Sequence, residues 1–213
     1  MDPAPRTRTR RRTGSYQAAD GKRAAIVEAA TTLFAQDGFH ETSIARVAAE
    51  AGTSQTGLLH HFNGKDALLL AVLHHKDIDW RSRFSDAKLG VRVLLGHVLD
   101  VLADEMKQPG ITRLFMTTAA AAATPNHPAA EYFRQRYQRM AENNAAAVRA
   151  SIAAGDLRPD VDADDLGRTL VAATDGLKVQ WLLSPDFDLV AACRTCFDDL
   201  LRGIAADGRG MDG

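Results

Sequence analysis

The chain has 213 residues, of which 46% are hydrophobic and 25% are charged, and its formal net charge is −1. These values are typical of a globular protein with a real core, in one large or two modest domains, and they exclude a uniformly basic nucleic-acid coat. No apolar stretch is long enough to span a membrane and no secretion signal is present, so we expect a cytoplasmic protein without a membrane partner.

Positive charge is concentrated at the start of the chain. Residues 1–23 contain seven basic and two acidic side chains, which leaves the remainder near −6. Residues 6–15 have no apolar periodicity and are predicted to be disordered, and we assign 1–19 to a flexible basic arm. The arm is either a solubilising tail or a source of sequence-independent phosphate contacts that make DNA binding more salt-dependent.

Residues 20–80 are predicted to form a three-helix domain around a helix-turn-helix motif at 43–62. The first helix is expected from about Gly21 to Asp37, where Gly38 ends it.

Within the motif, two short helices are joined by a tight turn. Gly52 stands where a helix needs a left-handed residue to stop, and Ser54 is a natural N-cap for the second helix. That helix is expected to bury Leu58 and Phe62. Its first turn is small, polar and uncharged, which suits entry into the DNA major groove. The alternative is an ordinary helical hairpin inside an all-helical domain.

The helix after the motif begins at Lys65, following the Asn63-Gly64 turn, and is expected to run to about Asp77. A lysine at a helix start opposes the helix dipole. A phosphate bound there would explain its position.

The order of residues between 26 and 69 resembles the amino-terminal domain of the TetR (tetracycline-repressor) family of bacterial transcription regulators. The pattern A-x-x-L-F-x-x-x-G-F begins at Ala30, and T-S-I, A-G and H-H-F-x-x-K follow it. The chain departs from the family at Leu59 and His60, where an aromatic pair is usual, so an aromatic DNA contact cannot be carried over. The motif and the resemblance together indicate a set of DNA-contacting residues: Ser43, Arg46, Ser54, Gln55, Thr56, Gly57, His60, His61 and Lys65.

Residues 81–213 are expected to form a larger helical domain for ligand binding and dimerisation, with 81–90 as its boundary. The Pro109-Gly110 pair is predicted to break the chain between two of its helices. The predicted helices cover 91–106, 111–123, 129–154, a segment that begins at Asp162 or Asp164 and stops at Ser184-Pro185, and a last segment that begins at Asp186.

The resemblance implies a small-molecule pocket in this second domain, and no cofactor. An apolar or amphipathic effector is expected, because aromatic and methionine side chains are available as walls, although each is individually more typical of plain core. The candidate pocket residues are Phe115, Met116, Phe133, Tyr137, Met140 and Trp181.

Two carboxyl-terminal helices with long apolar stripes are typical of a helical dimer interface, which the family also uses; packing within one chain is the alternative. The candidate interface residues are Leu166, Leu170, Ala173, Leu177, Leu189, Cys193, Phe197 and Leu200.

Catalytic and metal chemistry find little support in the sequence. Cys193 and Cys196 have redox-motif spacing but lie in an apolar stripe with no second pair, so we interpret them as reduced, buried thiols. The histidine pairs lack helical metal-site spacing, and nucleotide-binding or nucleophile-elbow motifs are absent.

The sequence therefore predicts an all-α homodimeric regulator, a repressor that a small molecule releases from palindromic double-stranded DNA. The ligand is expected to act by displacing the helix at 65–77 as a lever. The alternatives are a non-specific architectural DNA-binding protein or an enzyme that uses the second-domain pocket.

Overall fold

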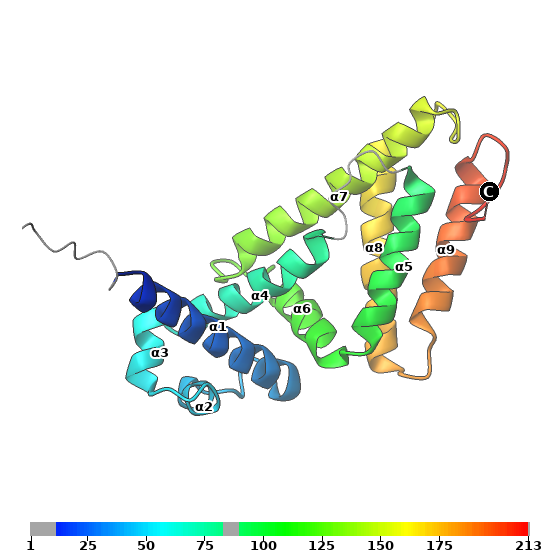
Figure 1. The fold of residues 1–213 in the computed structure, drawn as a ribbon. Coiled ribbons are helices and arrows are strands. Elements are labelled where there is room, and N and C mark those ends of the chain that lie inside the picture. Colours follow the sequence, from blue (N-terminus) through cyan, green and yellow to red (C-terminus); the bar gives the residue numbers. More distant parts are fainter. Residues whose placement is uncertain (1–11, 83–89, 213) are drawn as a thin grey trace, which may run out of the picture. The chain divides into compact units, whose positions relative to one another are not determined.

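The computed structural model describes residues 12–82 and 90–212, and within these ranges it contains nine α-helices and no β-strand (Figure 1). The predicted all-α class is confirmed. The chain divides into two compact units, residues 1–72 and 73–213, so the boundary falls inside helix α4 (Lys65–Ser82). In the described part of the chain, no helix is long and apolar enough to cross a membrane.

The first unit contains α1 (Arg12–Asp37), α2 (Ile44–Glu50), α3 (Gln55–His61) and the beginning of α4. The first helix begins at Arg12 rather than at the predicted Gly21, so residues 12–19 of the expected flexible arm are helical. A helix that is already nucleated propagates through good helix formers such as glutamine and alanine, which fill 17–19. The rest of the arm, residues 1–11, lies outside the described residues.

Apolar side chains from all four helices form the core of this unit. The loop between α1 and α2 is tied to it by Thr42, whose buried hydroxyl donates to the carbonyl of Gly38 at 2.9 Å. The principal core residues are Ile26, Val27, Ala30, Leu33, Phe34, Val47, Ala48, Leu58, Phe62, Leu68, Leu69 and Val72.

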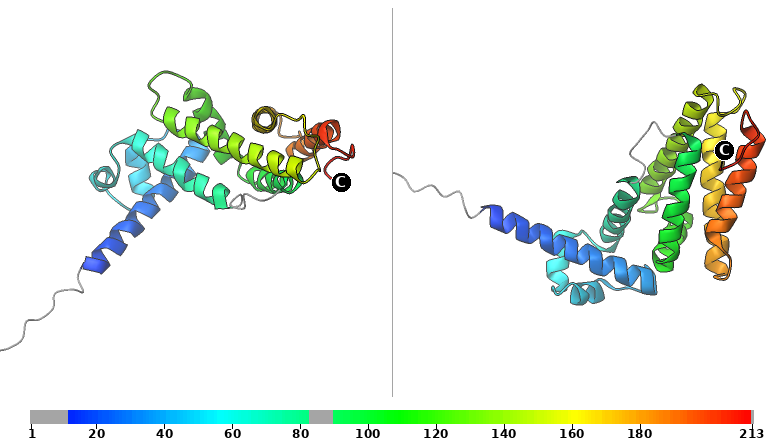
Figure 2. Two further views of the ribbon diagram at one scale, coloured as in Figure 1. Left: turned by 90° about the horizontal axis from the view of Figure 1, so that it is seen from above. Right: turned by 45° about the vertical axis from the view of Figure 1, so that its right-hand side comes forward.

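The second unit contains the end of α4 together with α5 (Val91–Met106), α6 (Pro109–Ala121), α7 (Ala130–Ala153), α8 (Ala163–Leu183) and α9 (Leu189–Ile204). Helices α5, α8 and α9 run side by side, and α7 packs at a slant against α8 and α5 (Figures 1 and 2). Their facing sides form one apolar core: Val91, Leu95, Leu99, Leu102, Ala145, Val148, Leu157, Ala163, Leu170, Trp181, Leu189, Cys193, Phe197, Leu201 and Ala205.

Three helix starts in this unit refine the predictions. Pro109 opens α6 instead of breaking the chain before it, because proline has no N–H to lose and a suitable φ at the first helical position. Asp162 is the N-cap of α8, and its carboxylate accepts from the amides of Asp164 and Asp165. Asp188 caps α9, so this helix begins later than the predicted Asp186.

The boundary between the units comes earlier than the predicted 80/81, because the second half of α4 belongs to the packing of α7. The Tyr132 hydroxyl donates to the carbonyl of Leu73 at 3.1 Å, and the rings of Tyr132 and His74 meet edge to face. One turn further along α4, Asp77 is almost fully buried and accepts from Arg136 and, at 2.7 Å, from Arg139. Most of the boundary predicted at 81–90, residues 83–89, lies outside the described residues.

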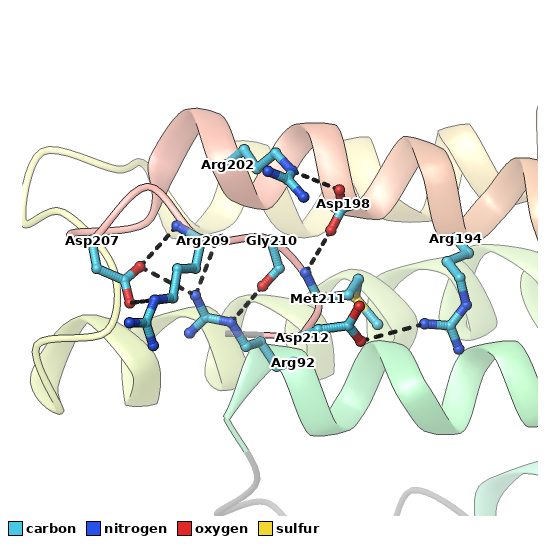
Figure 3. A network of polar contacts seen from close by, with 9 residues as sticks. All are labelled: Arg92, Arg194, Asp198, Arg202, Asp207, Arg209, Gly210, Met211 and Asp212. Atoms are coloured by element: carbon cyan, nitrogen blue, oxygen red, sulfur yellow. Dashed lines mark hydrogen bonds and ion pairs between the residues drawn. The ribbon is translucent and has the colours of Figure 1, made fainter.

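The segment after α9 folds back across α5 and α9 (Figure 3). The guanidinium of Arg92 donates to the carbonyl of Gly210 at 2.8 Å, and the amide of Met211 donates to Asp198 at 2.8 Å. Hydrogen bonds from Arg202 and from the Met211 amide hold the pKa of the Asp198 carboxyl below its usual range. These contacts connect the two ends of the second unit.

Candidate functional sites

Two serine caps and one glycine set the geometry of α2 and α3. Ser43 Oγ accepts from the Arg46 amide at 3.2 Å, and Ser54 Oγ accepts from the Gly57 amide at 3.0 Å. Gly52 has φ of +63°, the left-handed conformation that lets the chain leave one helix and enter the next within a few residues. The sequence predicted both the Gly52 stop and the Ser54 cap.

The nine predicted DNA contacts all lie in the first unit, and none is buried. Leu58 and Phe62 fix α3 in the core, being 0% and 4% exposed, so the opposite side of the helix faces solvent. The exposed members of the set are Ser43, Arg46, Ser54, Gln55, Thr56 and His60, and the half-buried ones are Gly57, His61 and Lys65.

Gly57 leaves space for the hydroxyl groups at the start of α3. A Cβ at this position would stand 2.7 Å from Thr53 Oγ1 and 3.2 Å from Ser54 Oγ, so a larger residue would require these side chains to shift. The position therefore supports the geometry of the helix that carries the polar side chains.

Lys65 and Arg46 both have partners within the first unit. Lys65 Nζ donates to the carbonyl of His40 at 3.0 Å and lies 4.6 Å from the centroid of the Phe39 ring. These two groups account for a lysine at a helix start, so its position does not by itself require a phosphate. Arg46 forms an exposed ion pair with Asp37 at 2.8 Å.

Leu59 was left out of the predicted contacts, yet it is 44% exposed on α3. It follows Gln55 by four residues, and residues four apart share one face of a helix. The departure from the aromatic family pattern at this position was the available signal.

The second unit contains a cavity of about 550 Å³ between α4, α5, α7, α8 and α9. This is within the usual size range of small-molecule sites. Aliphatic side chains and one ring form most of its wall: Ile78, Leu94, Leu95, Val98, Val101, Leu102, Met140, Leu170, Val171 and Phe197.

Of the six predicted pocket residues, Met140 lines this cavity and Tyr137 lines a second hollow between α7 and α8. Phe115, Phe133 and Trp181 are buried in the core and Met116 is half-buried. The ring centroids of Phe115 and Phe133 are 6.2 Å apart, so these aromatics pack against each other.

Two clusters of charged side chains line the same cavity. One is Asp77 with Arg136 and Arg139, described above. The other is the pair of Glu105 on α5 and Lys178 on α8, whose Oε2 and Nζ atoms are 2.9 Å apart; these residues are only 7% and 6% exposed. Sequence reasoning missed both clusters, since their members are far apart in the chain.

The predicted interface residues fall into two groups. Leu170, Leu189, Cys193 and Phe197 are covered by their own chain, at 3% exposure or less, and cannot contact a second copy without unfolding. The other four are half-buried: Leu166, Ala173, Leu177 and Leu200.

The apolar surface that α8 leaves exposed lies elsewhere, at Val179 (45% exposed) and Leu183 (79%). Neither residue belongs to the predicted stripe, and their four-residue spacing, which places them on one face of the helix, is the sequence signal for this surface.

Both cysteines are free thiols, Cys193 buried and Cys196 half-buried. Burial raises the pKa of the Cys193 thiol to about 11, which keeps it protonated and unreactive at neutral pH. Among the residues that the structure describes, no group of three or more His, Cys, Asp or Glu could hold a metal ion.

Comparison with protein families decides which family has this arrangement. Residues 26–72 match the family described as bacterial regulatory proteins, tetR family, and residues 92–205, more than half of the chain, match the one described as BetI-type transcriptional repressor, C-terminal. The chain belongs to the TetR family of bacterial regulatory proteins. The resemblance noted in the sequence is confirmed.

The individual TetR relatives have low sequence identity to this chain or match only a short part of it. The regulator RutR of Escherichia coli is 46% identical over 57 residues, and the match spans 27% of this chain and about a quarter (27%) of the relative's own length. SmeT, described as the repressor of a Stenotrophomonas maltophilia multidrug efflux pump, has the same fold: the TM-score is 0.74 over 87% of this chain and 91% of SmeT, at 18% identity.

A protein from Saccharomonospora viridis that is described as a transcriptional regulator was solved in complex with choline. It is 25% identical to this chain, and the TM-score is 0.74 over 87% of this chain and 98% of that one.

Proposed function

We propose that the protein is a sequence-specific DNA-binding transcriptional regulator, a homodimeric repressor that a small-molecule effector releases from a palindromic operator. The observation that carries the proposal is that the amino-terminal family match falls on the unit suited to DNA binding, and the carboxyl-terminal match falls on the unit that contains the cavity. Residues 26–72 contain α2 and the solvent-exposed polar side of α3, and residues 92–205 supply most of the cavity wall.

The DNA-binding part is assigned to the exposed residues of α2, α3 and the start of α4. Gln55 and Thr56 begin α3 with uncharged hydrogen-bonding groups that suit base edges in the major groove. Ser43, Arg46 and Lys65 are assigned to the phosphate backbone, where they fix the register without reading sequence. Arg46 and Lys65 would exchange their intramolecular partners for phosphate on binding.

The effector part is assigned to the 550 Å³ cavity, whose mainly aliphatic wall suits an apolar or amphipathic molecule. The relative described with choline supports a small-molecule ligand in this fold.

The proposed coupling between the two parts runs through α4. This helix is continuous from Lys65 to Ser82, and Asp77 and Ile78 from its second half line the cavity. A ligand that moves Arg136 or Arg139 would change the hydrogen bonds that hold Asp77. Because Lys65 belongs to the same helix, the disturbance would reach the DNA-binding unit.

Selection of binding sites from a random duplex pool tests the DNA-binding part. A palindromic consensus should emerge, bound at least about 10³-fold more tightly than random duplex at physiological salt. Gln55→Ala should relax discrimination at one base pair by about 1–3 kcal/mol. Lys65→Ala should weaken binding to all sequences alike and lower the salt slope by about one.

The control is Lys107→Ala, which removes an exposed lysine of the second unit and should leave the salt slope unchanged. Equal affinity for every duplex would identify a non-specific architectural protein instead. A changed base preference in Lys65→Ala would contradict the assigned division between base and phosphate contacts.

A further inference from the structure

The cavity contains a buried ion pair, Glu105 with Lys178, in which one carboxylate oxygen has no hydrogen-bond partner. In the described ranges, three buried side-chain atoms have no hydrogen-bond partner: Nδ1 of His97, Oγ1 of Thr112 and Oε2 of Glu105. Of these residues, only Glu105 lines the cavity. Its Oε2 atom lies 2.9 Å from Lys178 Nζ, close enough for an ion pair but without the alignment of a hydrogen bond. An unsatisfied buried acceptor is costly, so a donor from a ligand would be favoured here.

Three other polar residues of the cavity wall already have hydrogen-bond partners, and Asn143 also lines it. Asp77 accepts from two arginines, the Thr174 hydroxyl donates to the Leu170 carbonyl at 2.7 Å, and Asn144 donates to the Gly167 carbonyl at 3.2 Å. Among the described residues of the cavity wall, Glu105 is the one with a buried side-chain atom that has no hydrogen-bond partner, so we place a ligand's polar end at the Glu105–Lys178 pair.

The charges around the Glu105–Lys178 pair determine whether the polar group of the ligand should be charged or neutral. Lys178 lies 3.9 Å from a second carboxylate, that of Asp175, so a ligand carboxylate would meet two negative charges beside one positive. With the two arginines that hold Asp77, the formal charges around the cavity sum to zero, so a ligand ammonium group would likewise add an uncompensated charge in this low-dielectric space. A neutral group that both donates and accepts would hydrogen-bond Glu105 and Lys178 together without adding charge.

We infer that the cavity binds an apolar molecule with an uncharged donor-and-acceptor head, an alcohol or a phenol, whose hydroxyl donates to Glu105 Oε2 and accepts from Lys178 Nζ. The aliphatic wall contacts the apolar body of the molecule. This inference rests on the effector cavity of the proposed function and adds the chemical class of its ligand.

Four probes with an octyl or octanoyl chain test the head group by isothermal titration calorimetry on the full-length protein: 1-octanol, octanoate, octylammonium and 1-methoxyoctane. The ether accepts a hydrogen bond but cannot donate one. Octanol should bind at least tenfold more tightly than each of the other three. Measurements on the wild-type protein alone can overturn the inference. They do so if octanol does not bind, or if octanoate, octylammonium or the ether binds as tightly as octanol or more tightly.

Replacing the pair by apolar residues of similar size gives the second test. The double variant Glu105→Met/Lys178→Met removes both charges together, a change that buried ion pairs commonly tolerate. Octanol and methoxyoctane should then bind within about threefold of each other. The control, Glu131→Gln/Arg134→Gln, removes an exposed pair on α7 outside the cavity and should keep the tenfold preference. A preference retained in the Met variant overturns the assignment of the head group to this pair.

Operator binding with and without each probe separates this inference from the proposed function. Octanol that binds with the stated selectivity but leaves operator affinity unchanged would contradict the effector role and leave the head-group assignment intact. A charged probe that binds most tightly and releases the operator would support the regulator and overturn the inference.

Discussion

Leu59 is an apolar side chain, 44% exposed, that α3 presents on the face carrying Gln55. In the major groove, the thymine methyl group is the apolar feature that such a side chain can contact, while glutamine pairs with adenine. The two residues together therefore favour a half-site in which a thymine lies close to a recognised adenine.

Replacing individual thymines of the operator by deoxyuracil removes only the 5-methyl group, so it isolates this contact. One thymine in each half-site should prove sensitive, with a loss of about 0.8 kcal/mol, roughly fourfold in affinity, for one buried methyl group. Leu59→Ala should bind the thymine and uracil operators equally, and can be measured by gel shift. Thr56→Ala is the control that should keep the uracil effect. If no thymine-to-uracil replacement changes the affinity of the wild-type protein, Leu59 does not contact a thymine methyl group.

Residues whose role is local could be predicted from the sequence, and residues whose role depends on distant partners could not. Gly52 and Ser54 act on backbone groups within three residues of themselves, which makes their signals readable. Glu105 and Lys178 meet only after four helices have packed. Phe115 and Phe133 are residue types that often line ligand pockets, but their rings pack against each other.

At the scale of helices, α7 and α8 are the most closely packed pair, and Gly167 permits their approach. A Cβ at this position would stand 2.6 Å from the carbonyl oxygen of Ala141 and 2.9 Å from the amide nitrogen of Ala145. Both are backbone atoms, which cannot rotate away as a flexible side chain would.

Gly167→Ala should therefore destabilise the protein by about 1–3 kcal/mol, the usual cost of overpacking, despite the better helix propensity of alanine. Urea denaturation measures the change in the free energy of unfolding. Gly96→Ala is the matched control in the middle of α5, where no atom lies within 4 Å of the added Cβ, and it should stabilise by about 0.5–1 kcal/mol. A neutral or stabilising Gly167→Ala would show that the two helices can separate at little cost.

The exposed pair Val179 and Leu183 on α8 provides apolar area for a second copy, in keeping with the proposed dimer. Leu183→Glu should shift the protein toward monomer in sedimentation velocity, because a carboxylate would be buried unpaired. Val93→Glu, which changes a 48% exposed side chain on α5, should leave the assembly unchanged. If neither substitution changes the assembly, α8 does not contribute this face to a dimer.

The number and order of helices could be predicted because each has its own apolar stripe and breakers. The partition of those stripes between core and surface could not. Cys193 and Leu183 lie on helices of similar pattern, yet one is fully buried and the other is 79% exposed. The packing of α9 against α5 and α8, and of α8 against α7, decides which stripe is covered.

At the scale of the whole molecule, the proposed repressor requires effector and operator to oppose each other. A tenfold loss of operator affinity needs about 1.4 kcal/mol of coupling, and operator must weaken effector binding by the same factor. Titrating effector into free and operator-bound protein measures both. Asp77→Asn, which weakens the hydrogen bonds from Arg136 and Arg139, should reduce the coupling, measured as the ratio of the effector affinities of the free and the operator-bound variant. Equal effector affinity in the two wild-type samples would contradict the α4 model.

The contact between Arg92 and Gly210 also has a consequence for how the protein folds. It joins positions 118 residues apart, whereas the contact of Lys65 with His40 in the first unit spans only 25. Contacts between distant positions form slowly, because the chain must first lose the entropy of a long loop. On the ribosome, the first unit should therefore acquire its structure early, while α5 waits for the last helix and the segment after it. Until they emerge, the apolar side of α5 remains open to chaperones.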